Sequence, residues 1–143
     1  METVKKRKEL KIVARDRVGT IADISSLISE KEVNVEDISV YTMGGDAIIH
    51  LITSDNNKLL KLFTEKGYKA EEREVVVMSL KNRPGALHKV AEKLKEENID
   101  VKYLYGTVSN KSEDTTLVFA SSNNEKAIEV LGYILSLSEW GRE

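Results

Sequence analysis

The sequence predicts an α+β fold made of two similar units in tandem, each an antiparallel sheet with two helices on one face. Three observations predict it. The segment RDRVGTI at positions 15–21 returns as KNRPGAL at positions 81–87. Both segments stand between a β-branched run and an amphipathic stretch. Aligning Gly19 with Gly85 gives a period of 66 residues (85 − 19), and self-similarity at such a period indicates two copies of one supersecondary unit.

The composition is that of a soluble globular protein and argues against several function classes. The chain has 143 residues, of which 41% are hydrophobic and 32% charged. A formal net charge of −2 argues against nucleic acid as a partner. The absence of Cys excludes disulfides, thiol catalysis and thiolate metal sites, and it suits a cytoplasmic protein. We expect no membrane partner, because no apolar run approaches the length of a membrane span.

Each copy begins with a strand, a glycine loop and a helix. The β-branched runs at 10–14 and 75–80 predict the first strands. The second run is more uniformly apolar than the first, as expected of a central strand that is covered on both faces. After each glycine loop, apolar residues recur at helical spacing over 21–28 and 87–94, which predicts two amphipathic helices.

The second strand of each copy carries a break in its pattern. Positions 33–40 and 99–105 read as strands, but the apolar alternation changes phase between 35 and 38 and between 101 and 104. This predicts a β-bulge at the same place in both copies. The Gly44–Gly45 pair predicts a hairpin into a third strand. The corresponding loop of the second copy is two residues longer, so the offset between the copies becomes 68 from Asp46 and Asp114 onward.

The remaining elements are a third strand, a second helix and a fourth strand. Third strands are expected at 47–53 and 115–121, followed by helices whose N-caps come from 54–56 and 122–124. A fourth strand at 68–74 runs into the second copy without Pro or Gly. At the C-terminal end, positions 133–137 fit either a fourth strand or a longer helix, and the repeat favours the strand. The predicted domains are 1–73, with residues 1–8 frayed, and 74–143.

Each copy therefore reads β-α-β-β-α-β, the order of a ferredoxin-like sandwich. With this order, the Asn82–Leu87 loop and the strand start at 99–101, the chain resembles the ACT domain family. The first copy keeps Asp16, Gly19 and the Asn34–Val35 pair but has Val18 where the family usually has Pro. The resemblance implies regulatory modules that bind amino acids and related metabolites. It also implies a ligand held between two modules, with the loop of one opposite the second strand of the other.

The glycine loops are the candidate sites for an α-carboxylate, because a helix N-terminus presents unpaired N–H groups. A glycine there lets a ligand approach the backbone closely, although such a glycine is equally typical of a plain turn. An α-ammonium needs carboxylate or carbonyl oxygens. One copy could also be purely structural. The predicted ligand-binding residues are Asp16, Arg17, Val18, Gly19, Thr20, Ile21, Asn34, Asn82, Arg83, Pro84, Gly85, Ala86, Leu87, Asp100 and Tyr103.

No catalytic or metal-binding motif is present, and the two histidines lack suitably spaced partners. We expect neither a cofactor nor a metal. The predicted function is non-catalytic: binding of a free amino acid or related small metabolite, with a change in association as the output. The expected partners are a second copy, as a homodimer, and a biosynthetic enzyme or regulator. One alternative is an assembly subunit whose modules only dimerise, by analogy with the acetolactate synthase small subunit. RNA binding is disfavoured, because Val76, Val77 and Leu117 stand where stacking aromatics would be needed.

Overall fold

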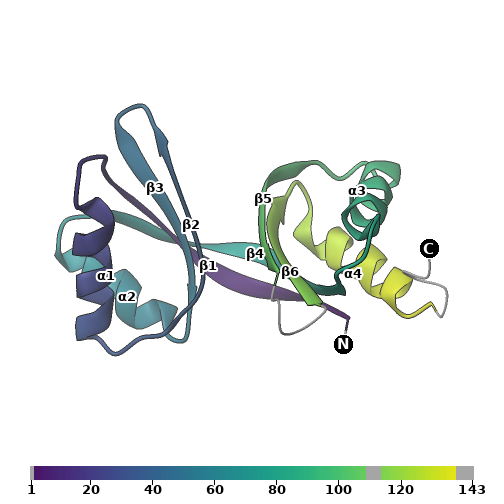
Figure 1. Ribbon diagram of the computed structural model, residues 1–143, viewed down its shortest axis with the longest axis horizontal. Coiled ribbons are helices and arrows are strands. Elements are labelled where there is room, and N and C mark those ends of the chain that lie inside the picture. The colour runs from purple at the N-terminus through teal and green to yellow at the C-terminus, as the bar shows by residue number, and fades with distance from the viewer. Residues whose placement is uncertain (1, 109–113, 138–143) are drawn as a thin grey trace. The chain divides into compact units, whose positions relative to one another are not determined.

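The computed structural model describes residues 2–108 and 114–137 and contains ten regular elements (Figure 1). It divides into a first unit, Lys8–Arg73, and a second unit, made of the described residues of Met1–Arg7 and Glu74–Glu143. In chain order the elements are β1 (Thr3–Arg15), α1 (Thr20–Glu30), β2 (Val35–Met43), β3 (Asp46–Thr53), α2 (Asn56–Glu65), β4 (Lys69–Lys81), α3 (Ala86–Glu96), β5 (Val101–Val108), β6 (Asp114–Ser121) and α4 (Asn124–Leu135).

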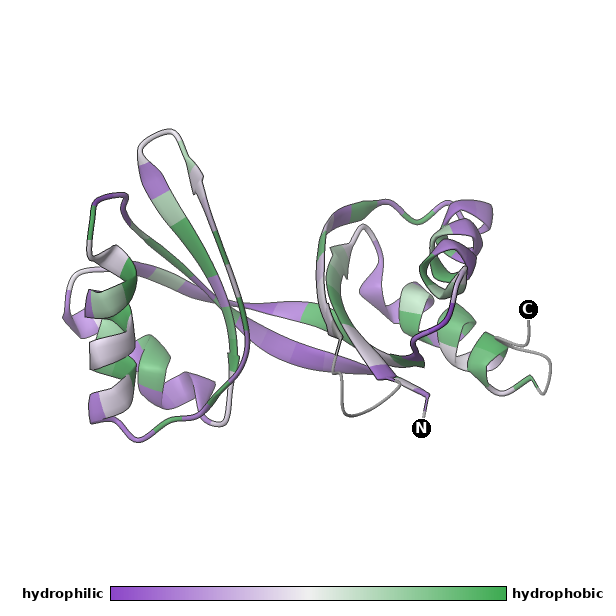
Figure 2. Cartoon of the chain, in the orientation of Figure 1, coloured by the Kyte–Doolittle hydropathy of each residue, from purple (hydrophilic) through white to green (hydrophobic). Residues whose placement is uncertain are grey.

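The first unit is the predicted β-α-β-β-α-β sandwich. Its strand order is β2-β3-β1-β4, and β3 pairs antiparallel with both β1 and β2. Helices α1 and α2 cover one face of this sheet, with their hydrophobic residues turned toward it (Figures 1 and 2). The core between the layers is built from side chains that alternate along the strands and recur at helical spacing, among them Ile12, Ile49, Leu51, Ile28 and Phe63.

The second unit has the same layers but obtains its fourth strand from the start of the chain. Its strand order is β1-β4-β6-β5, and only residues 2–7 accompany residues 74 onward in this unit. Val4 packs against the core of this unit. Lys6 forms an ion pair with Glu74 at 3.8 Å, and the Glu2 carboxylate accepts a hydrogen bond from the Lys81 N–H at 3.4 Å.

Two predictions are therefore wrong. Residues 133–137 do not form a strand, because α4 continues to Leu135 and residues 3–7 already occupy the place beside β4. In the helical conformation, Leu131 is buried and Leu135 packs against the core of the second unit. Residues 2–8 are not frayed, and residues 2–7 belong with the second unit and not with a domain 1–73. Pairing them with β4 satisfies a strand edge that would otherwise be open.

The predicted bulges and helix caps are confirmed. The pairing register shifts between Val35 and Asp37 in the first unit and between Val101 and Tyr103 in the second. Asp55 caps α2 by accepting from the Lys58 N–H at 3.1 Å. The equivalent Asn123 caps α4 by accepting from the Lys126 N–H at 3.0 Å.

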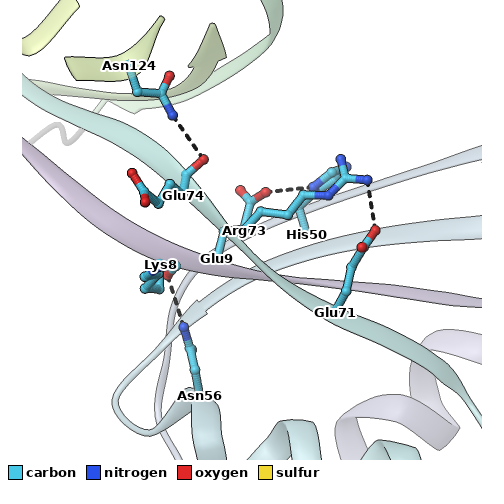
Figure 3. Close-up of polar contacts among 8 residues, drawn as sticks. All are labelled: Lys8, Glu9, His50, Asn56, Glu71, Arg73, Glu74 and Asn124. Carbon is cyan, nitrogen blue, oxygen red and sulfur yellow. Dashed lines mark hydrogen bonds and ion pairs between the residues drawn. The ribbon is translucent and has the colours of Figure 1, made fainter. Parts of the chain in front are cut away.

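The two units also repeat a side-chain network that fixes the start of the second helix. The Asn56 amide donates to the Lys8 carbonyl at 3.0 Å, and the Asn124 amide donates to the Glu74 carbonyl at 3.2 Å (Figure 3). Each amide oxygen accepts from a hydroxyl at the end of the preceding strand, Thr53 at 2.6 Å and Ser121 at 2.8 Å. The sequence repeat is thus a repeat of individual hydrogen bonds.

Candidate ligand-binding site

The loop between β4 and α3 is the candidate ligand-binding site, because a pocket lies beneath it and no side chain caps the helix that follows. Gly85 precedes the helix with φ of +85°, a left-handed conformation that glycine adopts without strain. The turn closes through a hydrogen bond from the Ala86 N–H to the Arg83 carbonyl at 3.2 Å. No side chain caps the N-terminus of α3, so the N–H groups that follow Ala86 in its first turn are available to a ligand oxygen.

Beneath this loop lies a pocket of about 650 Å³ within the second unit. Its apolar wall comes from β4, β6 and the outer face of α3, and its polar rim comes from the loop. Of the predicted residues, the structure brings five together here: Asn82, Arg83, Gly85, Ala86 and Leu87. Pro84 is exposed and does not line the pocket. The other lining residues are Leu80, His88, Ala91, Thr115 and Leu117.

Arg83 is the charged group that the pocket contains without a counter-ion. It is half-buried, and neither Arg83 nor Asn82 has a hydrogen-bonded or ionic side-chain partner in the described part of the chain. His88 is largely exposed, and its Nε2 atom lies 3.0 Å from Oε2 of Glu92. A half-buried guanidinium beside uncapped helix N–H groups favours a ligand carboxylate.

The equivalent loop of the first unit has the same backbone but satisfies its own polar groups. Gly19 also has positive φ, +92°. The hydroxyl of the buried Thr20 accepts from the Arg17 N–H at 3.2 Å and donates to the Arg15 carbonyl at 2.8 Å. The Arg17 guanidinium pairs with Asp23 at 3.2 Å. Asp16 donates its N–H to the Gly45 carbonyl at 3.0 Å.

Two apolar residues of the first loop are exposed. Val18 is fully exposed and Ile21 is 45% exposed. Ile21 lines a separate groove of about 460 Å³ between α1 and β2. The first loop therefore presents apolar surface outside and a closed hydrogen-bond network inside.

The predicted residues at the start of β2 and β5 lie away from the loop of their own unit. Asn34 donates its N–H to Ser54 Oγ at 3.0 Å, and Asp100 donates its N–H to Ser122 Oγ at 2.9 Å. Both serines follow the end of a third strand, whereas the glycine loops lie at its start. Helix α1, with 11 residues, puts about 16 Å between the two ends. Asp100 pairs with Lys102 at 3.0 Å, and Tyr103 is half-buried. A site that joins these residues to a loop of the other module stays a prediction.

Of the pocket residues that were not predicted from the sequence, His88 and Ala91 lie further along α3 and the others lie on β4 and β6. Leu80 lies on β4 just before the loop. Its alternation with Met78 and Val76 indicates that its side chain lies on the same face of the sheet as theirs, the face that the helices cover. Leu117 and Thr115 lie on β6, far along the chain, and only the sheet order brings them under α3. Within residues 2–108 and 114–137, no group of His, Asp or Glu side chains could hold a metal ion. No helix in this part of the chain is long and apolar enough to cross a membrane.

Residues 4–137 match the ACT domain pair family. The chain belongs to this family. The ACT resemblance and the fold of two ferredoxin-like units are therefore confirmed. No curated protein matches the chain.

Solved structures share the ACT pair architecture. Protein BT0572 from Bacteroides thetaiotaomicron superposes with a TM-score of 0.84 at 26% sequence identity, covering 91% of this chain and 89% of that one. The ligand-free regulatory subunit of aspartate kinase from Thermus thermophilus gives a TM-score of 0.65 at 13% identity, over 91% and 95% of the two chains. The corresponding subunit from Thermus flavus gives 0.62 at 14% identity, over 92% and 95%.

Proposed function

We propose that this ACT domain pair is a non-catalytic regulatory protein that binds a free amino acid or a related small metabolite and signals by a change in its association. The pocket under the Asn82–Leu87 loop carries the proposal. It combines a guanidinium that has no counter-ion among the described residues, uncapped helix N–H groups and an apolar wall. The regulatory aspartate kinase subunits of the same architecture support a regulatory role.

The pocket supports recognition of both ends of such a metabolite. A carboxylate would accept hydrogen bonds from the Arg83 guanidinium and from the N–H groups that follow Ala86 in the first turn of α3, and such charge-assisted hydrogen bonds are strong. The rest of the molecule would lie against Leu80 and Leu117, where apolar contact adds affinity. A ligand that ties the loop to the helix changes the stability of this unit, which couples binding to any equilibrium in which the unit takes part.

Thermal unfolding against each of the twenty amino acids and their 2-oxo acids, in millimolar excess, tests the proposal. A ligand that binds the native state raises the unfolding temperature by mass action. We expect a rise with one or a few compounds, and its loss in Arg83→Met. No rise with any compound would contradict ligand binding.

A second candidate function is assembly alone, and the edge strand β2 favours it. β2 stands at one end of the strand order. It exposes Ile38 and Met43 by 51% and 63%, and positions 38–43 carry no charge. Edge strands usually carry charged residues or Pro that block pairing. The partner that fits is a second copy of this chain, because antiparallel pairing of β2 with itself about a two-fold axis places the same uncharged run on both sides.

A further inference from the structure

We infer that the pocket under α3 is selective for an apolar monocarboxylate that lacks an ammonium group, such as a 2-oxo acid, over the zwitterionic amino acid of the same skeleton. This inference rests on the proposed function and names the ligand class of that site. Three observations carry it: the charge of the pocket lining, a difference between the two copies, and the nature of the walls.

The described residues that line the pocket have an unbalanced positive charge. Arg83 has no anionic partner among them, and the lining contains no Asp or Glu. The other nitrogen-bearing ring of the lining, His88, has its Nε2 atom 3.0 Å from Oε2 of Glu92. A ligand with a single negative charge balances Arg83. An amino acid brings an ammonium as well, which would find only neutral oxygens such as those of Asn82 and Thr115, and incomplete pairing of a desolvated charge is costly.

The first copy shows what an internally balanced version of this loop looks like. There, Asp23 holds the guanidinium of Arg17 at 3.2 Å. One repeat later, 66 positions on, Lys89 stands in place of Asp23 and Arg83 in place of Arg17. The buried hydroxyl of Thr20, which ties the first loop together, is replaced by the methyl group of Ala86. The second copy therefore keeps the cation while lacking both the carboxylate and the hydroxyl that engage this loop in the first copy.

The walls define the rest of the ligand. The side chains of Leu80, Leu87, Ala91 and Leu117 offer an apolar surface. This surface suits a branched or aromatic side chain of the ligand. None of these four side chains can pair with a second charged group of the ligand. The ligand class is thus an apolar chain that ends in one carboxylate.

Isothermal titration at pH 7.5 with two matched pairs tests the selectivity. The probes are 4-methyl-2-oxopentanoate against leucine and phenylpyruvate against phenylalanine. We expect one of the oxo acids to bind at least about 10-fold more tightly than its amino acid, which corresponds to the loss of one imperfectly paired charged group. Tighter binding of the amino acid would overturn this inference and leave the proposed function intact. Binding of neither member of either pair would overturn the inference, and a flat thermal screen would separately overturn the proposed function.

Three variants locate the binding in the second copy. Arg83→Met should weaken binding of the preferred oxo acid by about 10- to 100-fold, whereas the matched Arg17→Met should leave it unchanged. Lys89→Asp supplies the carboxylate that the first copy has, without touching the pocket lining, and should weaken binding by a similar factor. Equal losses in Arg83→Met and Arg17→Met, or full affinity in Lys89→Asp, would overturn the assignment.

Discussion

The Nδ1 atom of His50 lies 2.8 Å from Oε1 of Glu9, and the two side chains are 2% and 0% exposed (Figure 3). The pair joins β1 to β3 in the first unit. The His50 ring also stacks on Tyr41, with centroids 5.8 Å apart and planes inclined by 20°. A polar pair this deeply buried depends on both partners, because removing one leaves the other desolvated with an incomplete set of hydrogen bonds.

His50→Leu should therefore destabilise the protein strongly. The substitution removes a hydrogen bond from the buried Glu9 carboxyl group, and breaking a buried pair in this way costs about 3 kcal/mol. Urea unfolding measures the change. The exposed pair of Arg73 and Glu71, also at 2.8 Å, provides the control, since Arg73→Gln should change the free energy of unfolding by less than about 1 kcal/mol. Similar losses in both variants would contradict the role given to burial.

Val4→Asp should loosen the second unit and spare the first. Val4 packs against the second core, so a carboxylate there should expel residues 3–7 from the place beside β4 and cost about 2 kcal/mol. Hydrogen exchange measures this loosening: amide protons in the second half of β4 and in α4 should exchange faster. Lys5→Asp, at an exposed neighbouring position, is the control. Unchanged exchange in α4 would show that residues 3–7 do not support this unit.

Gly85→Asp should abolish ligand binding through its charge. Beyond the adjacent residues, no atom lies within 4 Å of a Cβ built at Gly85, so the side chain has room, but its carboxylate repels a ligand carboxylate at the same loop. Gly85→Asn carries the same φ strain without the charge and should keep most of the affinity, because both residues tolerate the left-handed region. Titration with the preferred compound measures the affinity of both variants. Equal losses of affinity in Gly85→Asp and Gly85→Asn would assign the loss to backbone strain and not to charge. The matching Gly19→Asp reports on the first loop and should have no effect.

Ile38→Lys should reduce self-association if β2 is the pairing edge. A lysine on an edge strand disfavours strand addition. Leu104→Lys, one repeat later on β5 and 40% exposed, is the matched control for charge and exposure. Sedimentation velocity over a range of concentrations measures the dimer fraction. A dimer that persists in Ile38→Lys and dissociates in Leu104→Lys would place the interface on the other edge.

Local features of the fold were predictable from the sequence because their causes lie within a few residues. The phase breaks in the second strands predicted both bulges, and the polar segments 54–56 and 122–124 predicted both caps. The glycine loops were recognisable for the same reason, so five of the pocket residues were predicted together. These signals depend on spacing along the chain and on nothing that folding brings in from elsewhere.

What the tertiary structure alone decided depends on partners distant in sequence. The repeat favoured a strand at 133–137, yet residues 3–7 take the place beside β4 and α4 runs on to Leu135. The pairing of Glu9 with His50 spans 41 positions. The sequence by itself determined two ACT units and their elements, because local propensity and periodicity set these. The choice of strand partners came from tertiary packing, because an open strand edge is satisfied by whichever group the fold brings nearest.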